Sequence, residues 1–334
     1  MENEKELSVD RRAVLDMRGA GASAIDQAIR RLGFSIRVLG RPDLPAWVPE
    51  RSGPLALGLS LVCLRDILLY CQAQDIRMYR LHCGLAPAPA PAVEMMALWR
   101  TYEGEAVMLG DLVRTMDIRL SFHPYSLVIL NTPDDDRVWR SIAHLESQVH
   151  FLEALALGPE AVITLHVGGV YGDVISSCER FVRRYNALPD AIRHRIVLEN
   201  DDHRFSVAEL LYIHDRSGVP LVFDWQHHHV LNQQNLPWRE ALTRCLATWP
   251  SGVTPKIHLS SPRTELRSDN GRIKVPSWTE HSDYMQPFEC IALLRASQNL
   301  PFDIMLECKA RDLAVIKLRQ DLVRFAPDLA ASIR

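Results

Sequence analysis

The sequence predicts an α/β protein of the (β/α)8 TIM-barrel class, on three observations. Short apolar stretches alternate with longer stretches whose apolar residues recur every three or four positions. This alternation repeats eight times, as in a closed barrel of parallel strands with outer helices. The chain has 334 residues, 47% of them hydrophobic, which suits one large domain with a sizeable core. A doubly wound open sheet is the main competing fold.

Eight stretches are predicted to be strands because they are short and rich in apolar residues, and polar or glycine-containing turns follow them. In chain order, the predicted strands are 33–40, 76–83, 118–124, 161–169, 195–202, 220–227, 255–261 and 302–308.

Helices are predicted between these strands, where apolar residues have helical spacing: 60–74, 141–156, 206–218 and 239–249. For the helix 206–218, the sequence contains signals for both the first and the last turn. Ser206 is the expected N-cap, Glu209 stands at the capping-box position, and Gly218 is the expected C-terminal stop.

Three segments depart from the repeating unit. Residues 1–30 have little strand character and are predicted to be an N-terminal extension ahead of one barrel domain, 31–334. Residues 86–92 (APAPAPA) are proline-rich and therefore stiff and extended. Residues 261–281 are polar and too long for a simple connection, which favours a functional loop. The last two segments follow strands, so both are expected on the same rim of the barrel.

Composition narrows the class of protein. The seven cysteines are scattered and form no CxxC pair, which favours free thiols in a reducing cytoplasm. The charged start resembles no signal peptide, and the most apolar stretch contains Arg65 and Asp66, so we expect an amphipathic helix and no membrane partner. The net charge of −3 argues weakly against nucleic-acid binding, but the distribution of charge decides binding.

Oxygen and nitrogen donors stand near the ends of six predicted strands. They are His123, His166, Glu199, Asp224 with His227, Lys256 with His258, and Glu307. In a barrel, the C-terminal ends of the strands surround the active site, so we expect these side chains to converge. Buried carboxylates need compensating cations, and imidazoles with carboxylates are ligands of Zn, Mn or Fe. The number of donors favours two or three ions, which serve chiefly phosphoester hydrolysis.

Simpler interpretations apply to single residues. A lone histidine at a strand end is more often a hydrogen-bonded structural residue, the HHH run 227–229 fits a solvated turn, and Asp201–Asp202 fit a helix cap. His144, Glu146, His150 and His214 lie in helical stretches and are taken as ordinary surface or packing residues. Six strand ends that all carry donor residues are much less probable by chance.

Other chemistries fit less well. The chain has no G-x-S-x-G elbow and no Walker A motif. The glycine-rich HVGGVYGD, 166–173, lacks the spacing of a dinucleotide site, so no nucleotide cofactor is expected. A nucleophilic Cys83 beside His82 is a further hypothesis, which no other sequence feature supports.

At these residues the chain resembles the UV damage endonuclease family of metal-dependent nucleases. The similarity runs from about Leu32 to Pro327 and rests on several long motifs in order. They include GFSIRVLG, SFHPYSLVILNTP, LGPEAVITLHVGGVYGD, LPDAIRHRIVLENDD, VPLVFDWQHHH, PKIHLSSPRTE, HSDYM and FDIMLECKARDLA. The resemblance implies a TIM barrel, related in architecture to endonuclease IV, with up to three divalent ions.

The resemblance also implies the ligand set, and Mn²⁺ as the ion, with Zn²⁺, Co²⁺ or Fe²⁺ as alternatives. The ligands would be His123, His166, Glu199, Asp224, His227, His258, His281 and Glu307. His281 enters on the resemblance alone. Lys256 matches a family position two residues from His258, on the same side of the strand. It is expected to act with Glu199 in catalysis, by polarising the phosphate or, if carboxylated, as a ligand.

The implied substrate is damaged double-stranded DNA, cut at the phosphodiester immediately 5′ to a lesion. Such an enzyme kinks the duplex and extrudes weakly paired bases. Side chains expected to contact DNA are Phe34, Tyr125, Ser126, Leu127, Arg204 and Arg263. Further candidate phosphate contacts, each equally well a solvated surface charge, are Arg267, Arg272, Lys274, Lys309 and Arg311.

Several of these positions depart from the family. Ser126 and Leu127 stand where the family has Gln and an aromatic, Phe34 replaces a tyrosine, and His82–Cys83 replace two small hydroxyl residues. The proline-rich 86–92 replaces a more polar stretch. Two interpretations stay open: a repair endonuclease with an altered lesion probe, or a paralogue that acts on another phosphoester, such as an abasic site, or only binds DNA. The sequence leaves the oligomeric state open.

Overall fold

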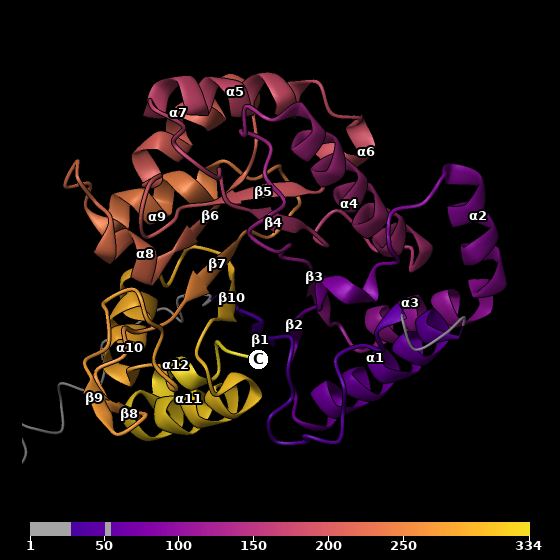
Figure 1. Ribbon diagram of the computed structural model, residues 1–334. Coiled ribbons are helices and arrows are strands. Elements are labelled where there is room, and N and C mark those ends of the chain that lie inside the picture. Colours follow the sequence, from indigo (N-terminus) through magenta and orange to yellow (C-terminus); the bar gives the residue numbers. More distant parts are fainter. Residues whose placement is uncertain (1–27, 51–54) are drawn as a thin grey trace, which may run out of the picture.

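The computed structural model describes residues 28–50 and 55–334. Eight parallel strands form a central barrel with helices around it (Figure 1). The barrel strands are β1 (Leu32–Ser35), β2 (Met78–Arg80), β3 (Arg119–Ser121), β4 (Ile163–Leu165), β5 (Ile196–Glu199), β6 (Leu221–Asp224), β7 (Lys256–Leu259) and β10 (Asp303–Leu306). Each lies within, or within one residue of, a predicted strand, and the predicted barrel is confirmed.

The strands pair in the order β3-β2-β1-β10-β7-β6-β5-β4, every pair parallel. The two ends of this order meet through a parallel bridge between Phe122 and Ile163, which closes the ring. Closure excludes the doubly wound open sheet. Because all eight strands run the same way, their C-terminal ends lie on one rim, where the connecting loops can form a site.

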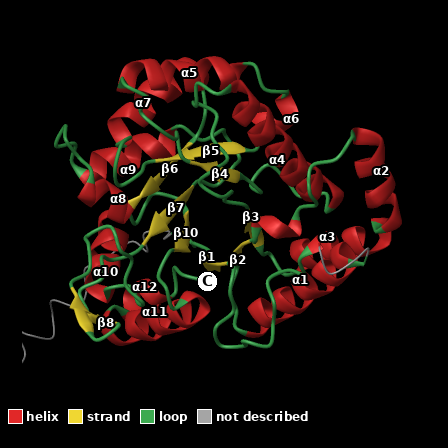
Figure 2. Ribbon diagram, in the orientation of Figure 1, coloured by secondary structure: helices red, strands yellow, loops and turns green. Residues whose placement is uncertain are grey.

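Helices enclose the strands (Figure 2). They are α1 (Ala56–Ala73), α2 (Ala92–Thr101), α3 (Glu103–Thr115), α4 (Asp135–Ala154), α5 (Val174–Asn186), α6 (Asp190–Arg193), α7 (Val207–Ser217), α8 (Trp225–Val230), α9 (Trp238–Ala247), α10 (Pro287–Ala296), α11 (Arg311–Phe325) and α12 (Pro327–Ala330), with a 3-10 turn, η3 (Cys83–Leu85). The capping box of Ser206 and Glu209 is present on α7, and Gly218 ends that helix with φ of 72°.

The strands are shorter than predicted, for local reasons. β1 ends at Ser35 because Ile36 has a positive φ of 66°, which no extended strand contains. β6 ends at Asp224 because its side chain accepts a hydrogen bond from the His227 amide and caps α8. The HHH run therefore lies in a helix and not in a turn. The polar segment 261–281 contains a hairpin of β8 (Arg267–Asp269) and β9 (Arg272–Lys274).

Residues 1–27 of the predicted extension lie outside the described residues. Arg30 already belongs to the barrel, because it pairs in parallel with Ile333 near the C-terminus. Within the described part of the chain, α1 alone is long and apolar enough to cross a membrane by length and composition. It packs onto the core through Leu61, Leu64 and Ile67. All seven cysteines are free thiols, as expected.

Gly33 is a position where the barrel tolerates no side chain. A Cβ atom there would lie 1.9 Å from the backbone oxygen of Met78 on β2. We therefore expect Gly33→Ala to lower the free energy of unfolding by roughly 1–3 kcal/mol or more, through overpacking. Urea denaturation measures this change. Gly158→Ala is the control, because a Cβ at Gly158 meets nothing within 4 Å. Equal stability of the two variants would contradict the prediction.

Candidate metal centre

The donors predicted at the strand ends converge in the mouth of the barrel. They come from the C-terminal ends of β3 to β7 and β10, and their side chains are mostly buried. The cavity above them has a volume of about 770 Å³ and is lined by His123, His166, His227, His281 and Glu307 among others. Six separated strand ends deliver donors to one cluster beneath this cavity, as a metal centre in a barrel requires.

Glu199 is the central residue of this cluster. It ends β5 and is only 1% exposed. Its Oε2 lies 3.0 Å from Nε2 of His123, and its Oε1 lies 2.8 Å from Nδ1 of His258. Further rings surround the same carboxylate: His166 Nε2 is 3.8 Å from Oε2, and His227 Nδ1 is 3.6 Å from Oε1. Glu199 therefore contacts candidate metal-binding histidines from four other strand ends.

Asp224 and Glu307 complete the acidic side of the cluster. Asp224 Oδ1 lies 3.6 Å from Nδ1 of His227. Glu307 contacts His258, with Oε1 3.3 Å from Nδ1, and its Oε2 lies 3.9 Å from Nε2 of His281. His281, which follows the β8–β9 hairpin, thus joins the strand-end donors in the same cavity, where the resemblance places it.

Four of the histidines are oriented by partners at Nδ1. Nδ1 of His227 lies 2.9 Å from the carbonyl oxygen of Asn200, and Nδ1 of His166 lies 3.4 Å from that of Glu199. Nδ1 of His123 lies 3.3 Å from the carbonyl oxygen of Pro124. A carbonyl oxygen only accepts, so Nδ1 donates at each of these contacts, and Nε2 is the ring nitrogen that a metal ion would bind after displacing any proton on it. Such outer partners orient metal-binding histidines.

The fourth of these histidines, His281, reaches the same tautomer through a hydroxyl. The Ser260 hydroxyl donates to Oε1 of Gln226 at 2.7 Å, so it accepts from Nδ1 of His281, also at 2.7 Å. Nε2 of His281 is left free on the side of Glu307. His258 differs, because its Nδ1 faces Glu199 and Glu307, and its buried Nε2 has no hydrogen-bond partner among the described residues.

The electrostatics of the cluster favour a bound cation. Burial raises the pKa of Asp224 well above its ordinary value, and the nearby Glu199 and Glu307 carboxylates add to the effect. Its Oδ2 is buried without a partner among the described residues. Burial opposes protonation of His227, but Asp224, Glu199 and Glu307 outweigh it and raise the pKa of His227 to about 9. The acidic groups therefore attract positive charge, which a metal ion would supply.

The remaining histidines are in the neutral form that binds metal ions. Burial lowers the pKa of His281 to about 4, and it also lowers the pKa values of His123, His166 and His258. Two sets of donor atoms lie close enough to hold an ion, and they share Glu199: His123, His166 and Glu199, and Glu199, Asp224, His258 and Glu307. The residues present therefore fit a divalent metal centre.

Two basic side chains, Lys256 and Arg80, flank the acidic cluster. Lys256 lies on β7 and is fully buried, and its Nζ has no hydrogen-bond partner among the described residues. Burial, with Arg119 and Arg80 nearby, lowers the pKa of Lys256 well below its usual value. Arg80, at the end of β2, forms an ion pair with Glu307. Arg80 is missing from the sequence-based candidates, because the predicted strand 76–83 places it three residues before the strand end, whereas β2 ends at Arg80.

Some of the side chains expected to contact DNA are exposed in the structure, and others are buried. Tyr125, Ser126 and Leu127 lie exposed on the loop after β3, and Leu127 is 71% exposed. Arg204 is also exposed and lines the cavity over the cluster. The side chain of Arg263 is only 10% exposed and pairs with Asp283. The placement of Phe34 among the DNA contacts is wrong, because Phe34 is fully buried and its ring packs 5.3 Å from that of Tyr79.

Cys83 and Asp201 do not have the roles that the sequence suggested for them. The Cys83 thiol donates to the carbonyl oxygen of His123 at 3.1 Å, and burial raises the pKa of Cys83 to about 11. It is therefore a protonated thiol and not an activated nucleophile. Asp201 does not cap α7, because Ser206 does so. Its Oδ1 instead accepts hydrogen bonds from the amides of His203 and Arg204 and orders the loop after β5.

Fold and site together define a class: a TIM-barrel protein with a buried histidine–carboxylate centre of the kind that binds metal ions. Comparison with known proteins gives the family. The family model described as UV-endonuclease UvdE matches residues 59–329. The chain belongs to the UV-endonuclease UvdE family.

Individual relatives agree with this family. The UV DNA damage endonuclease of Bacillus pumilus (strain SAFR-032) is 32% identical over 269 residues, covering 79% of this chain and 80% of that protein. The UV DNA damage endonuclease of Bacillus cereus (strain B4264) is 33% identical over 266 residues, covering 77% and 78%. The crystal structure of SacUVDE is similar with a TM-score of 0.76 at 25% identity, covering 88% of this chain and 98% of that one.

Glu199 belongs to both donor sets, so its replacement is expected to reduce metal binding most. We expect Glu199→Gln to retain fewer divalent ions than the unaltered protein after metal loading and desalting, as measured by elemental analysis. Added Mn²⁺ should also no longer raise its melting temperature, because a ligand stabilises the folded state only in proportion to its binding. Glu240→Gln, on the exposed face of α9, is the control. Unchanged metal content in Glu199→Gln would contradict the assignment.

Proposed function

We propose that the protein is a metal-dependent DNA repair endonuclease that hydrolyses the phosphodiester 5′ to a UV-type or other helix-distorting lesion. As a member of the UV-endonuclease family it is an endonuclease that acts on DNA. The observation that carries the finer proposal is the convergence of His123, His166, Glu199, Asp224, His227, His258, His281 and Glu307 in the barrel mouth. Such a donor set suits phosphoester hydrolysis.

We propose Mn²⁺ as the ion, in a centre of two or three ions that includes Glu199 as a shared ligand. The overlap of two donor sets at Glu199 supports more than one ion position. The mixture of imidazole and carboxylate donors also accepts Zn²⁺, Co²⁺ and Fe²⁺. When bound, the ions would supply Lewis-acid stabilisation of the charge that develops on the phosphate oxygens.

The side chains around the centre have separate roles in this proposal. Glu199 holds the ligand rings in place from its buried position. The Nζ atom of Lys256 has no hydrogen-bond partner among the described residues, and it would bind and polarise the phosphate. Arg80 offsets part of the charge on Glu307. Glu199 and Lys256 are buried, and burial strengthens their electrostatic interactions.

Damaged double-stranded DNA is the proposed substrate, and the loop after β3 is the proposed lesion probe. Tyr125 and Ser126 line the cavity over the donors, and Leu127 projects from the loop. Apolar side chains of this kind can enter between base pairs and unstack them. Such insertion costs least where pairing is already weakened by damage. Arg204, on the rim of the same cavity, is a proposed phosphate contact.

Nicking of damaged DNA tests the activity. We expect the full-length protein with Mn²⁺ to nick UV-irradiated duplex, chelator to abolish nicking, and Glu199→Gln to lower the rate by roughly 100-fold or more. That is the usual size of effect when a group that stabilises transition-state charge is lost. Nicking of abasic but not UV-irradiated DNA would overturn the lesion assignment. Tight DNA binding without product under any divalent ion would overturn the enzymatic proposal.

Replacement of the exposed Leu127 tests the proposed lesion probe. We expect Leu127→Ala to weaken binding to UV-damaged duplex about tenfold, because burial of a leucine side chain contributes roughly 1.5–3 kcal/mol. Binding to undamaged duplex should change little. Fluorescence anisotropy at constant salt measures both affinities. Leu59→Ala, at an exposed leucine on α1, is the matched control. An equal loss on damaged and undamaged DNA would show that Leu127 does not sense lesions.

A further inference from the structure

The segment that carries His281, residues 261–281, is joined to the barrel at few points. We call it the hairpin segment, because it contains β8 and β9. All three residues of β9 are exposed, and Figure 1 shows the hairpin at the edge of the molecule. The two ends of the segment meet, since Pro262 and His281 form an antiparallel bridge and the Arg263 amide donates to the carbonyl oxygen of Glu280 at 2.7 Å. His281 therefore reaches the candidate metal centre from a loop and not from a barrel strand.

One buried side chain, Gln226 on α8, holds the hairpin segment against the barrel. Gln226 is only 1% exposed and directly precedes the candidate ligand His227. Its Nε2 donates to the carbonyl oxygens of Trp278 at 2.9 Å and Glu280 at 3.3 Å. Among the described residues, no other hydrogen bond joins residues 264–280 to the chain outside the hairpin segment. Without this amide, the hairpin would be attached by its two ends alone.

The same amide also fixes the ring of His281. Because carbonyl oxygens only accept, the amide nitrogen of Gln226 must face the hairpin segment, and its Oε1 must face Ser260. Ser260 is fully buried, and its hydroxyl donates to this Oε1 at 2.7 Å. The hydroxyl therefore accepts from Nδ1 of His281, at 2.7 Å, while Nε2 of His281 lies 3.9 Å from Oε2 of Glu307. One hydrogen-bonded chain thus runs from the hairpin backbone to a candidate metal ligand.

Burial links the position of the hairpin segment to the orientation of His281. If the segment moved away from the barrel, the amide of Gln226 and the hydroxyl of Ser260 would lose buried partners, which is costly. The segment and the imidazole are therefore held in place together. A divalent ion bound at Nε2 of His281 would be a further attachment of the same segment to the barrel.

We propose that Gln226 and Ser260 are positioning residues of the metal centre, and that they couple docking of the hairpin segment to metal binding through His281. The proposal rests on the proposed function, in which His281 is a metal ligand, and it deepens that function by naming the residues on which this ligand depends. Such coupling is reciprocal: the bound ion holds the hairpin segment in place, and the docked segment raises the affinity for the ion.

Titration of the full-length protein with Co²⁺, followed by visible absorption, tests the effect on the metal centre. We expect Gln226→Leu and Ser260→Ala to weaken binding of the ion that His281 holds about 10- to 100-fold, the usual loss when a residue behind a metal ligand is removed. Their spectra should resemble the spectrum of His281→Ala, because each variant would lack the same imidazole ligand. A purely structural role would lower the melting temperature of the metal-free protein and leave the spectrum of the bound ion unchanged.

Trypsin digestion tests the hairpin segment itself. Arg267, Arg272 and Lys274 are exposed, and each is a site for trypsin. We expect Mn²⁺ to slow cleavage at these sites in the unaltered protein, because the bound ion holds His281 and the segment in place. In metal-free Gln226→Leu, cleavage should be several times faster than in the metal-free unaltered protein, and added Mn²⁺ should protect less. Mass spectrometry of the fragments identifies the cleaved sites.

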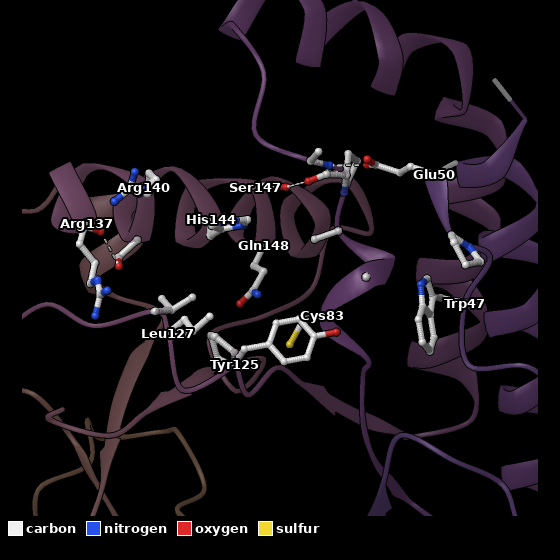
Figure 3. A pocket seen from close by; sticks show the side chains of 18 residues that line it. Trp47, Glu50, Cys83, Tyr125, Leu127, Arg137, Arg140, His144, Ser147 and Gln148 are labelled. Carbon is white, nitrogen blue, oxygen red and sulfur yellow. Dashed lines mark hydrogen bonds between the residues drawn. The ribbon is translucent and has the colours of Figure 1, made fainter. Parts of the chain in front are cut away.

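Gln148→Leu is the matched control, because it also removes a buried glutamine amide. Gln148 is 4% exposed and lies on α4, where it lines a separate cavity of about 580 Å³ beside Leu127 (Figure 3). The Co²⁺ affinity, the spectrum and the trypsin cleavage of this variant should equal those of the unaltered protein.

Unchanged spectra and unchanged cleavage in both Gln226→Leu and Ser260→Ala would overturn the proposal. If His281→Ala alters the Co²⁺ spectrum in that case, His281 is a ligand and only the two positioning roles are misassigned. If the unaltered protein binds no divalent ion, the proposed metal centre fails and the positioning proposal fails with it.

Discussion

A single buried carboxylate, Glu199, constrains which side chains can lie at the C-terminal ends of the barrel strands. A charge at that depth is costly unless partners surround it, and imidazole rings from β3, β4, α8 and β7 do so. Those rings can meet only because parallel closure brings every strand to the same rim. The fold therefore brings the strand ends together, and the charge of Glu199 requires that these ends carry side chains able to interact with a carboxylate.

The repeating unit of the fold was predictable because its signals are local. Apolar strands and helical spacing identified all eight barrel strands, and the Ser206–Gly218 signals matched the ends of α7. The strand ends were not predictable to the residue. At Ile36 the main chain adopts a left-handed conformation without a glycine. At Asp224 the side chain caps α8, whose first residues had been predicted as the end of a strand. Both depend on contacts that form only in the folded protein.

The site was predictable to a similar extent. Donors at strand ends follow directly from the barrel, so His123, His166 and Glu199 needed only the strand positions. His281 follows a hairpin and carries no strand signal, and it was found by resemblance alone. Phe34 was misplaced because adjacent strand residues face opposite sides and a sequence does not show which side is the core. Gln226 falls within the predicted strand 220–227, and only its place on α8 reveals its hydrogen bonds to residues 278 and 280.

The outer hydrogen bonds of the histidines have a consequence for evolution. His123, His166 and His227 are oriented by carbonyl oxygens, which every amino acid supplies. Substitutions at Pro124 or Asn200 that keep the main-chain path would leave those acceptors in place. A centre oriented by the main chain can survive extensive sequence divergence while the surrounding loops acquire new side chains. Relatives at about one-third identity are therefore compatible with one conserved arrangement of donor side chains.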